Sequence, residues 1–257
     1  MSLLSVRDIS RRFGGLTAVD SVSFDVFEGE IKAVIGPNGA GKTTLFNVVT
    51  GFDGADSGHV LFADEDITGM RPDRIVRAGV ARTFQNTQLF EEMSALDNVM
   101  VGCHATTKAG FAAAALRLPW TLREERLAEE EAMRLLRLVG LEAWKPAPAT
   151  DLPNGLRRSL EIARALATKP RLMLLDEPAA GLNTTETALL AETLFRIRDH
   201  GVTLVVVEHD MGLVMEISDE IIVLDRGARI AQGPPRLIQK DPKVVTAYLG
   251  EEEPGDG

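Results

Sequence analysis

Apolar and polar residues alternate near the start of the chain, along residues 3–8 and 18–27. A period of two places apolar side chains on one face of a strand, so both stretches predict antiparallel strands with one buried face. The next apolar stretch, EIKAVIG, is short and continuous and predicts a strand that ends in glycine. We expect a helix over about residues 41–50 to follow it. Residues 58–83 then predict strands and turns, with a short helix near 72–78.

The pattern changes from strand to helix in the middle of the chain. Apolar residues recur at helical spacing between about 92 and 168, and residues 122–139 predict a charged amphipathic helix. Further on, the continuous apolar runs RLMLLDE and VTLVVVEH are typical of parallel strands that helices cover on both faces. A helix over 184–199 is expected between them. The fold class predicted is α/β, with an antiparallel β edge at the front and an inserted helical lobe.

Composition and charge narrow the classes of protein. The chain has 257 residues, of which 45% are hydrophobic, and a net charge of −10. This charge disfavours nucleic acid as a partner, because phosphate contacts need an excess of Lys and Arg. Its one cysteine, Cys103, excludes an internal disulfide. No apolar signal segment and no run of about 18 apolar residues occurs, so we expect neither a signal peptide nor a membrane-spanning helix.

A glycine-rich motif lies between the predicted strand and the predicted helix. Residues 36–44, GPNGAGKTT, match the pattern G-x-x-x-x-G-K-[ST] in the structural context that this pattern requires. Its glycines let backbone N–H groups face phosphate oxygens, Lys42 can reach the β- and γ-phosphates, and Thr43 can ligate Mg²⁺. A simple glycine turn would leave the lysine unexplained. The expected ATP-binding residues of this loop are Gly36, Pro37, Asn38, Gly39, Ala40, Gly41, Lys42, Thr43 and Thr44.

Charged residues end two of the apolar runs. LMLLDEP delivers Asp176 and Glu177 to the carboxyl end of a strand, where parallel sheets bind ligands. Beside a phosphate-binding loop, Asp176 is the expected Mg²⁺ carboxylate and Glu177 is placed to polarise a water molecule. His209 ends the other run at the same edge, although a lone histidine there is more often structural. By themselves, Gln85 is an ordinary loop residue and Phe13 an ordinary packing residue.

Together these residues resemble the ATP-binding subunit of ABC transporters, and the resemblance covers nearly the whole chain. It implies a P-loop NTPase core with a RecA-like, mostly parallel sheet, an N-terminal antiparallel β subdomain and an inserted helical subdomain. It also implies that Phe13 stacks on adenine, that Gln85 senses Mg²⁺ and the membrane partner, and that His209 is the switch histidine. The cofactors implied are ATP and Mg²⁺. The site residues implied are Glu177, His209 and Gln85 for catalysis, and Thr43, Gln85 and Asp176 for the metal.

The same resemblance implies domain boundaries. Residues 1–250 are expected to form a single ABC ATPase domain, in which 1–86 and 169–250 make the core with its β subdomain. Residues 87–168 are expected to make the helical subdomain. The acidic end, residues 251–257, is expected to be a flexible tail.

The family signature, usually LSGGQ, departs from its pattern in this chain. LPNGL stands in its place and keeps only the first leucine and one glycine, but the following RRSLEIARAL is close to the family pattern. Pro153 suits the first turn of a helix, where its missing N–H is not needed. Asn154 can supply an amide donor. The residues expected to contact the ATP of a partner subunit are Leu152, Pro153, Asn154, Gly155 and Leu156.

Longer matches narrow the resemblance to one group of importers. GVARTFQNTQLFEEMSALDNVMVG, LLDEPAAGLN and DPKVVTAYLG look like the longer ATPase subunit of high-affinity branched-chain amino acid importers. The implied function is ATP hydrolysis that powers import of hydrophobic amino acids. The alternatives are a related importer of urea, amides or other amino acids, or a lipopolysaccharide exporter. A non-transport ABC ATPase fits less well, because the chain has one set of motifs and no sustained heptads.

The resemblance implies an assembly on the cytoplasmic face of the inner cell membrane. A second ATPase subunit, or a second copy of this chain, would pair with it head to tail over two ATP molecules. Two transmembrane permease subunits and an extracytoplasmic solute-binding protein would complete the complex. We expect the permeases to dock near residues 86–100, with the alanine-rich stretch 110–120 beside them.

Overall fold

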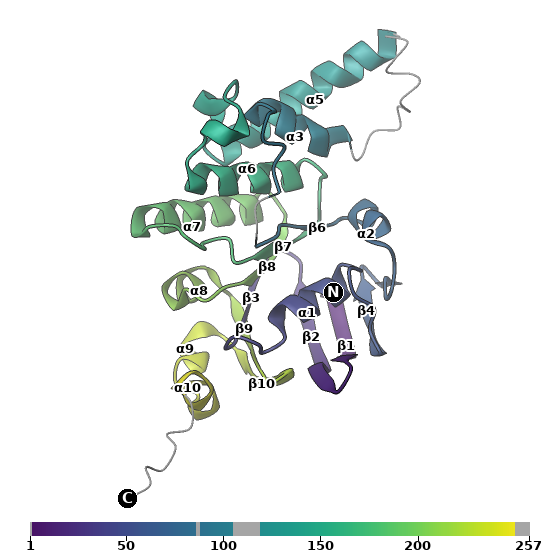
Figure 1. The fold of residues 1–257 in the computed structure, drawn as a ribbon, viewed down its shortest axis with the longest axis vertical. Coiled ribbons are helices and arrows are strands. Elements are labelled where there is room, and N and C mark those ends of the chain that lie inside the picture. Colours follow the sequence, from purple (N-terminus) through teal and green to yellow (C-terminus); the bar gives the residue numbers. More distant parts are fainter. Residues whose placement is uncertain (1, 86–87, 105–118, 250–257) are drawn as a thin grey trace, which may run out of the picture.

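The computed structural model describes residues 2–85, 88–104 and 119–249. Within these residues the strands form two sheets (Figure 1). An antiparallel sheet has the order β2-β1-β4-β5, and a mostly parallel sheet has the order β10-β9-β3-β8-β7-β6. The strands are β1 Ser2–Phe13, β2 Leu16–Phe27, β3 Ile31–Ile35, β4 Ser57–Phe62, β5 Glu65–Asp66, β6 Val80–Arg82, β7 Leu172–Asp176, β8 Thr203–Val207, β9 Glu220–Asp225 and β10 Ala228–Gly233.

The larger sheet brings distant parts of the sequence to one edge. β3, β7 and β8 are buried along their whole length, as their continuous apolar runs predict. They are parallel and adjacent, with Ala33 opposite Val206 and Leu175 in register with the same valine. Their carboxyl ends therefore lie side by side, and the three motifs of the sequence follow these ends directly.

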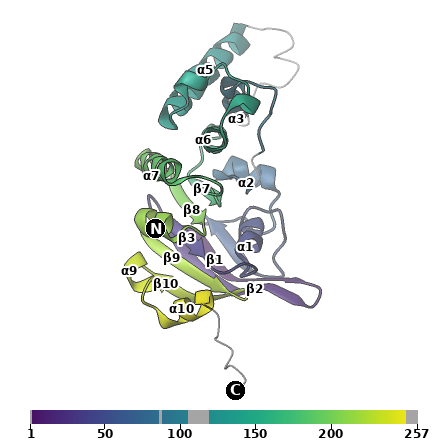
Figure 2. The ribbon, with the colours of Figure 1, turned by 60° about the vertical axis from the view of Figure 1, so that its left-hand side comes forward.

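Helix α1 (Lys42–Val49) packs between the two sheets (Figure 2). Its apolar side chains, among them Leu45 and Phe46, share one buried cluster with side chains from β1, β2, β4 and the core strands. The apolar side chains of α1 therefore hold the helix against both sheets. The short helix α2 (Pro72–Ala78) follows the antiparallel sheet and leads into β6.

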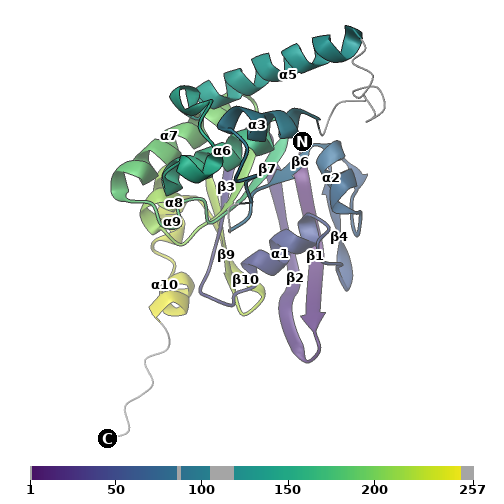
Figure 3. The ribbon, with the colours of Figure 1, turned by 45° about the horizontal axis from the view of Figure 1, so that its top comes forward.

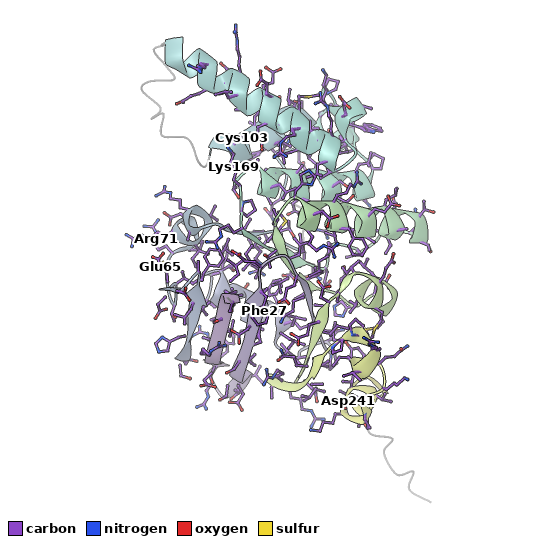
Figure 4. All side chains as sticks on the ribbon, turned by 180° about the vertical axis from the view of Figure 1, so that it is seen from behind. Phe27, Glu65, Arg71, Cys103, Lys169 and Asp241 are labelled. Atoms are coloured by element: carbon purple, nitrogen blue, oxygen red, sulfur yellow. The ribbon has the colours of Figure 1, made fainter. Side chains whose placement is uncertain are left out.

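A helical layer lies at one end of the molecule (Figures 1 and 3). It consists of α3 (Ala95–His104), α5 (Pro119–Leu138) and α6 (Asn154–Leu166), with the short 3₁₀ helices Glu142–Trp144 and Ala149–Asp151 between the last two. Helix α7 (Thr184–Asp199) joins this layer to the core through a shared apolar cluster. Figure 4 shows Cys103 and Lys169 close together at the base of the layer.

Helices α9 (Pro235–Ile238) and α10 (Pro242–Leu249) lie toward the opposite end of the molecule, where Figure 4 labels Asp241. Helix α8 (Met211–Ile217) lies between them and α7. All three helices pack against β9 and β10 through a separate apolar cluster. Over the described part of the chain, no helix combines the length and the apolar character that crossing a membrane requires.

The observed architecture confirms the predicted fold class. Two boundaries differ from the prediction for physical reasons. β1 continues to Phe13 instead of ending near residue 8. A bulge with Asp8 at φ +47° shifts the alternation of apolar and polar residues, so the sequence pattern does not reveal the second half of the strand. Helix α5 begins at Pro119, before the charged stretch, since proline is tolerated in the first helical turn. Residues 110–118 of the alanine-rich stretch and the tail 251–257 lie outside the described residues.

Candidate functional site: a phosphate-binding loop and its carboxylates

The glycine-rich loop turns tightly between β3 and α1. Gly36 and Gly41 have φ values of +152° and +99°, which L-residues rarely adopt. A Cβ would lie 2.1 Å from the carbonyl oxygen of Leu224 at Gly36, and 2.2 Å from that of Ala18 at Gly41. Only glycine therefore fits at both positions. The loop is held against two neighbouring segments while its other face stays open.

Lys42 closes the loop from within. Its Nζ donates to the carbonyl oxygens of Gly36 at 2.7 Å and Pro37 at 3.0 Å, and the side chain is buried. Burial lowers the pKa of the Lys42 ammonium, and the negative charges of Glu177 and Asp176 oppose that shift. A cation held this way is ready to exchange carbonyl oxygens for phosphate oxygens.

A cavity of about 620 Å³ opens over the loop and collects most of the predicted residues. Its lining combines a base-stacking candidate, a phosphate-binding loop, a carboxylate and a histidine. The lining residues are Phe13, Leu16, Thr17, Ala18, Asn38, Gly39, Ala40, Gly41, Lys42, Thr43, Thr44, Glu177, His209 and Arg226. Gly36 and Pro37 lie behind it as the acceptors for Lys42.

Phe13 stands at the edge of this cavity, 45% exposed. The guanidinium of Arg11 lies 4.7 Å from the centre of its ring, and Arg11 is held in turn by Asp56 at 3.2 Å. One face of the ring is therefore supported by a cation. An exposed aromatic ring fixed in this way suits stacking on a planar base.

Glu177 contacts two other predicted residues. Its Oε2 accepts a hydrogen bond from Gln85 Nε2 at 2.8 Å, and its Oε1 lies 2.6 Å from His209 Nε2. The residue has a left-handed backbone, with φ +50°, a conformation that often occurs at functional sites. Residues from two other segments, Gln85 and His209, thus hold this carboxylate where it lines the cavity.

Asp176 is oriented differently from its neighbour. It is buried, and its Oδ2 accepts a hydrogen bond from Arg82 Nη2 at 2.9 Å. Among the described residues, no group of three or more His, Cys, Asp or Glu side chains could hold a metal by itself. Mg²⁺ commonly binds through one or two protein oxygens together with substrate phosphates. Thr43 and Asp176 would suit such a site, because Thr43 belongs to the phosphate-binding loop and the charge of Asp176 acts on Lys42 of that loop.

Glu208 is a further site residue that the motif analysis did not find. Its buried carboxylate accepts hydrogen bonds from the backbone N–H groups of Ala179 at 2.6 Å and His209 at 2.9 Å. Burial raises the pKa of the Glu208 carboxyl, and these N–H donors oppose that shift. The carboxylate ties the segment after Glu177 to the segment of His209. Its signal in the sequence is an acidic residue at the end of a fully apolar strand.

The signature stretch lies apart from the cavity. None of Leu152, Pro153, Asn154, Gly155 and Leu156 belongs to the lining residues that the structure describes. Pro153, with ψ 154°, is the N-cap of α6 and not part of its first turn, where the sequence had placed it. A Cβ at Gly155 would lie 2.8 Å from Glu186 Oε1, so this glycine accommodates the carboxylate that caps α7.

Helix α6 also contacts the segment of Gln85. Arg158 Nη1 donates to the carbonyl oxygen of Phe84 at 2.9 Å, and its Nη2 donates to that of Gln85. The helix that begins at the signature stretch therefore holds the backbone of the residue that contacts Glu177. Through Gln85, the helical layer is thus linked to the carboxylate of Glu177.

The fold and the cavity together define a P-loop nucleotide-binding protein with the carboxylates of an ATPase. Residues 19–180 match the family model described as "ABC transporter", and residues 228–254 match the one described as "Branched-chain amino acid ATP-binding cassette transporter". The chain belongs to the ABC transporter family, and it is a nucleotide-binding ATPase subunit coupled to transport. The resemblance stated from the sequence is thereby confirmed.

Two relatives and one solved structure are similar over nearly their whole length. The high-affinity branched-chain amino acid transport ATP-binding protein BraF of Pseudomonas aeruginosa is 45% identical, covering 97% of this chain and 98% of its own. The protein LivG of Escherichia coli, described in the same words, is 44% identical with the same coverage. An ATP-binding cassette of an ABC transporter in its ADP conformation matches with 34% identity and a TM-score of 0.85, covering 98% of this chain and 100% of its own.

Proposed function

We propose that this chain hydrolyses ATP to drive the import of branched-chain amino acids. The observation that carries the proposal is the carboxylate of Glu177, held by Gln85 and His209 at the mouth of the phosphate-loop cavity. The two relatives named above supply the substrate class, because both are described as branched-chain amino acid transport proteins. The family match at residues 228–254 supports the same class.

Each predicted residue takes one role in ATP hydrolysis. Phe13 stacks on the base, while the loop of residues 36–44 and Lys42 bind the phosphates. Thr43, Asp176 and Gln85 would hold Mg²⁺, which would neutralise phosphate charge when bound. Glu177 accepts a proton from the attacking water. The 2.6 Å contact with His209 supports a role for that residue in orienting the carboxylate.

The second wall of the ATP site comes from another subunit in this proposal. The signature residues 152–156 lie outside the cavity of their own chain, which supports a role on a partner's ATP. The partner is a second ATPase subunit, or a second copy of this chain, in a head-to-tail pair. At the start of α6, Asn154 and backbone N–H groups serve as donors to the γ-phosphate. Pro153 and Leu156 contribute fewer donors than the usual serine and glutamine.

The permease subunits are proposed to dock in a groove between the core and the helical layer. A cavity of about 330 Å³ opens there beside the segment of Gln85. It is largely apolar, and its polar lining consists mainly of the buried carboxylate of Glu161, two arginines and one glutamine. The lining residues are Val76, Ala81, Arg82, Phe84, Gln88, Phe90, Val101, Gly102, Glu161, Arg164, Ala165 and Thr168. The complex would lie on the cytoplasmic face of the inner membrane, with an extracytoplasmic solute-binding protein opposite.

A carboxylate placed in this groove is expected to prevent permease docking. Val101→Asp should lower the amount of permease that co-purifies with this chain by more than about tenfold, because desolvating an unpaired charge costs several kcal/mol. ATP binding by the isolated chain should stay unchanged, since Val101 does not line the nucleotide cavity. Leu127→Asp is the matched control, because Leu127 is an exposed leucine on α5 outside the groove. Equal co-purification of both variants would contradict this docking site.

The substrate class is tested in the assembled complex. We expect ATP hydrolysis by the reconstituted transporter to be stimulated by its solute-binding protein loaded with leucine, isoleucine or valine. Urea, short amides and lipopolysaccharide should give no stimulation at the same concentrations. The measurement is phosphate release from vesicles holding the full complex. Stimulation by urea or amides alone would assign the chain to a related importer, and stimulation by lipopolysaccharide would assign it to an exporter.

A further inference from the structure

Arg82 connects two elements that carry the proposed Mg²⁺ ligands. Its Nη1 donates to Asn47 Oδ1 at 2.7 Å and to Thr50 Oγ1 at 3.1 Å, at the end of α1. Its Nη2 donates to Asp176 Oδ2 at 2.9 Å, at the end of β7. Helix α1 begins with Lys42 and Thr43. One guanidinium therefore fixes Asp176 relative to the helix that carries Thr43, another of the proposed ligands.

The environment of Arg82 suits a guanidinium and no other cation. The Arg82 side chain is 5% exposed and that of Asp176 is 4% exposed, so the ion pair is shielded from water. The rings of Phe46, Phe52 and Phe84 lie with their centres 5.0 to 5.9 Å from the Arg82 Cζ. A flat, weakly hydrated guanidinium fits between aromatic rings and reaches two sets of acceptors at once, whereas a lysine ammonium is a single, strongly hydrated point charge.

The ion pair with Arg82 also compensates the negative charge of Asp176. Asp176 and Glu177 are adjacent carboxylates, and the negative charges of both interact with the ammonium of Lys42. The bond from Arg82 occupies Oδ2 of Asp176 and compensates its charge. The other oxygen, Oδ1, is then available for a metal ion or for its bound water. Groups that orient a ligand in this way are usually worth about 10–100-fold in metal affinity.

We propose that Arg82 is a positioning residue that sets the Mg²⁺ affinity of the ATP site by holding Asp176 against α1. This inference rests on the proposed ATPase mechanism and adds a residue to it. Arg82 also lines the groove proposed for the permease. Phe84 lines the same groove, and its ring lies beside the Arg82 guanidinium. The ion pair thus lies between the docking groove and the metal ligands.

The test is Arg82→Lys in the full-length chain, with nucleotide binding measured by a fluorescent ATP analogue. In EDTA we expect an affinity within about twofold of the wild type, because phosphate binding by Lys42 and the loop does not involve Arg82. In a Mg²⁺ titration of the ATP-loaded chain, we expect the midpoint to rise by about 10–100-fold. Arg171→Lys is the matched control, since Arg171 precedes the other end of β7 and pairs with Glu28 at the surface.

Three outcomes decide the proposal. An unchanged Mg²⁺ midpoint in a folded Arg82→Lys chain would overturn it, and so would equal losses of affinity with and without Mg²⁺, which would mean a purely structural role. If this variant gives no cooperative thermal transition, Thr50→Val carries the test, because it removes one acceptor of Arg82 without touching Asp176. Its midpoint should move in the same direction. A wild-type chain without Mg²⁺-dependent ATP binding would instead refute the proposed function.

Discussion

Replacing Glu177 with glutamine is expected to lower ATP turnover of the assembled transporter by ~10²–10⁴-fold, the usual contribution of a general base. The amide keeps the shape of the side chain and one acceptor oxygen for the contact with His209. It cannot take a proton from water. ATP binding should survive, because the phosphate-binding loop and Asp176 are unchanged. The measurement is steady-state phosphate release, together with retention of ATP in the isolated complex.

The departure of the signature from its pattern adds a second expectation for the same variant. The head-to-tail pair would have two ATP sites, each completed by the signature of the opposite subunit. Where the partner ATPase carries a fuller signature, the ATP site built on Lys42 and Glu177 should hydrolyse ATP faster, because it uses the partner's signature. The site served by residues 152–156 loses donors, and one preorganised donor is typically worth ~10²–10³ in rate. Neutralising Glu177 should therefore cost more turnover than neutralising the corresponding glutamate of the partner. Equal losses would contradict this asymmetry, and wild-type turnover by Glu177→Gln would contradict the assignment of the base.

Lys42→Ala is expected to weaken ATP binding by about 10²-fold or more, since removing one partner of a buried, hydrogen-bonded charge pair costs ~2–5 kcal/mol. The Lys42 ammonium is the cation that closes the loop, and the carbonyl oxygens of Gly36 and Pro37 would lose their donor. Equilibrium binding of a fluorescent ATP analogue measures the effect. Lys240→Ala, at an exposed position outside the cavity, is the control.

The Lys42 experiment needs a second readout because the side chain is buried. Thermal unfolding of Lys42→Ala and of the longer Lys42→Met should show whether the fold survives the loss of the internal hydrogen bonds. A folded variant that binds ATP as tightly as the wild type would contradict the role of Lys42.

The sequence predicted most of the site because the site depends on strand ends. In a parallel sheet, residues that follow different strands meet at one edge, so the contact of Glu177 with His209 could be anticipated from two apolar runs. The glycine positions of the loop could also be predicted, because they belong to a motif of fixed spacing. Helix α7 begins at Thr184, as predicted, with Asn183 and Glu186 as its capping pair.

Arg82 and Glu208 could not be predicted in the same way. The contact of Arg82 with Asp176 depends on the pairing of β6 with β7, and a three-residue edge strand has no pattern that sets its register. Glu208 acts through backbone N–H groups, whose positions follow from the turns and not from the side chains. Pro153 was placed in the first turn of α6 and is its N-cap instead, because proline is compatible with both positions.

The central claim is that hydrolysis at Glu177 of this chain drives amino acid import, and uptake of labelled leucine measures it most directly. The complex, with its solute-binding protein, is placed in vesicles with ATP supplied on the side of this chain. We predict ATP-dependent accumulation of leucine with the wild-type chain and only background uptake with Glu177→Gln, at equal ATP binding. Leucine uptake at the wild-type rate by the Glu177→Gln complex, or ATP hydrolysis by the wild-type complex without leucine accumulation, would contradict the account.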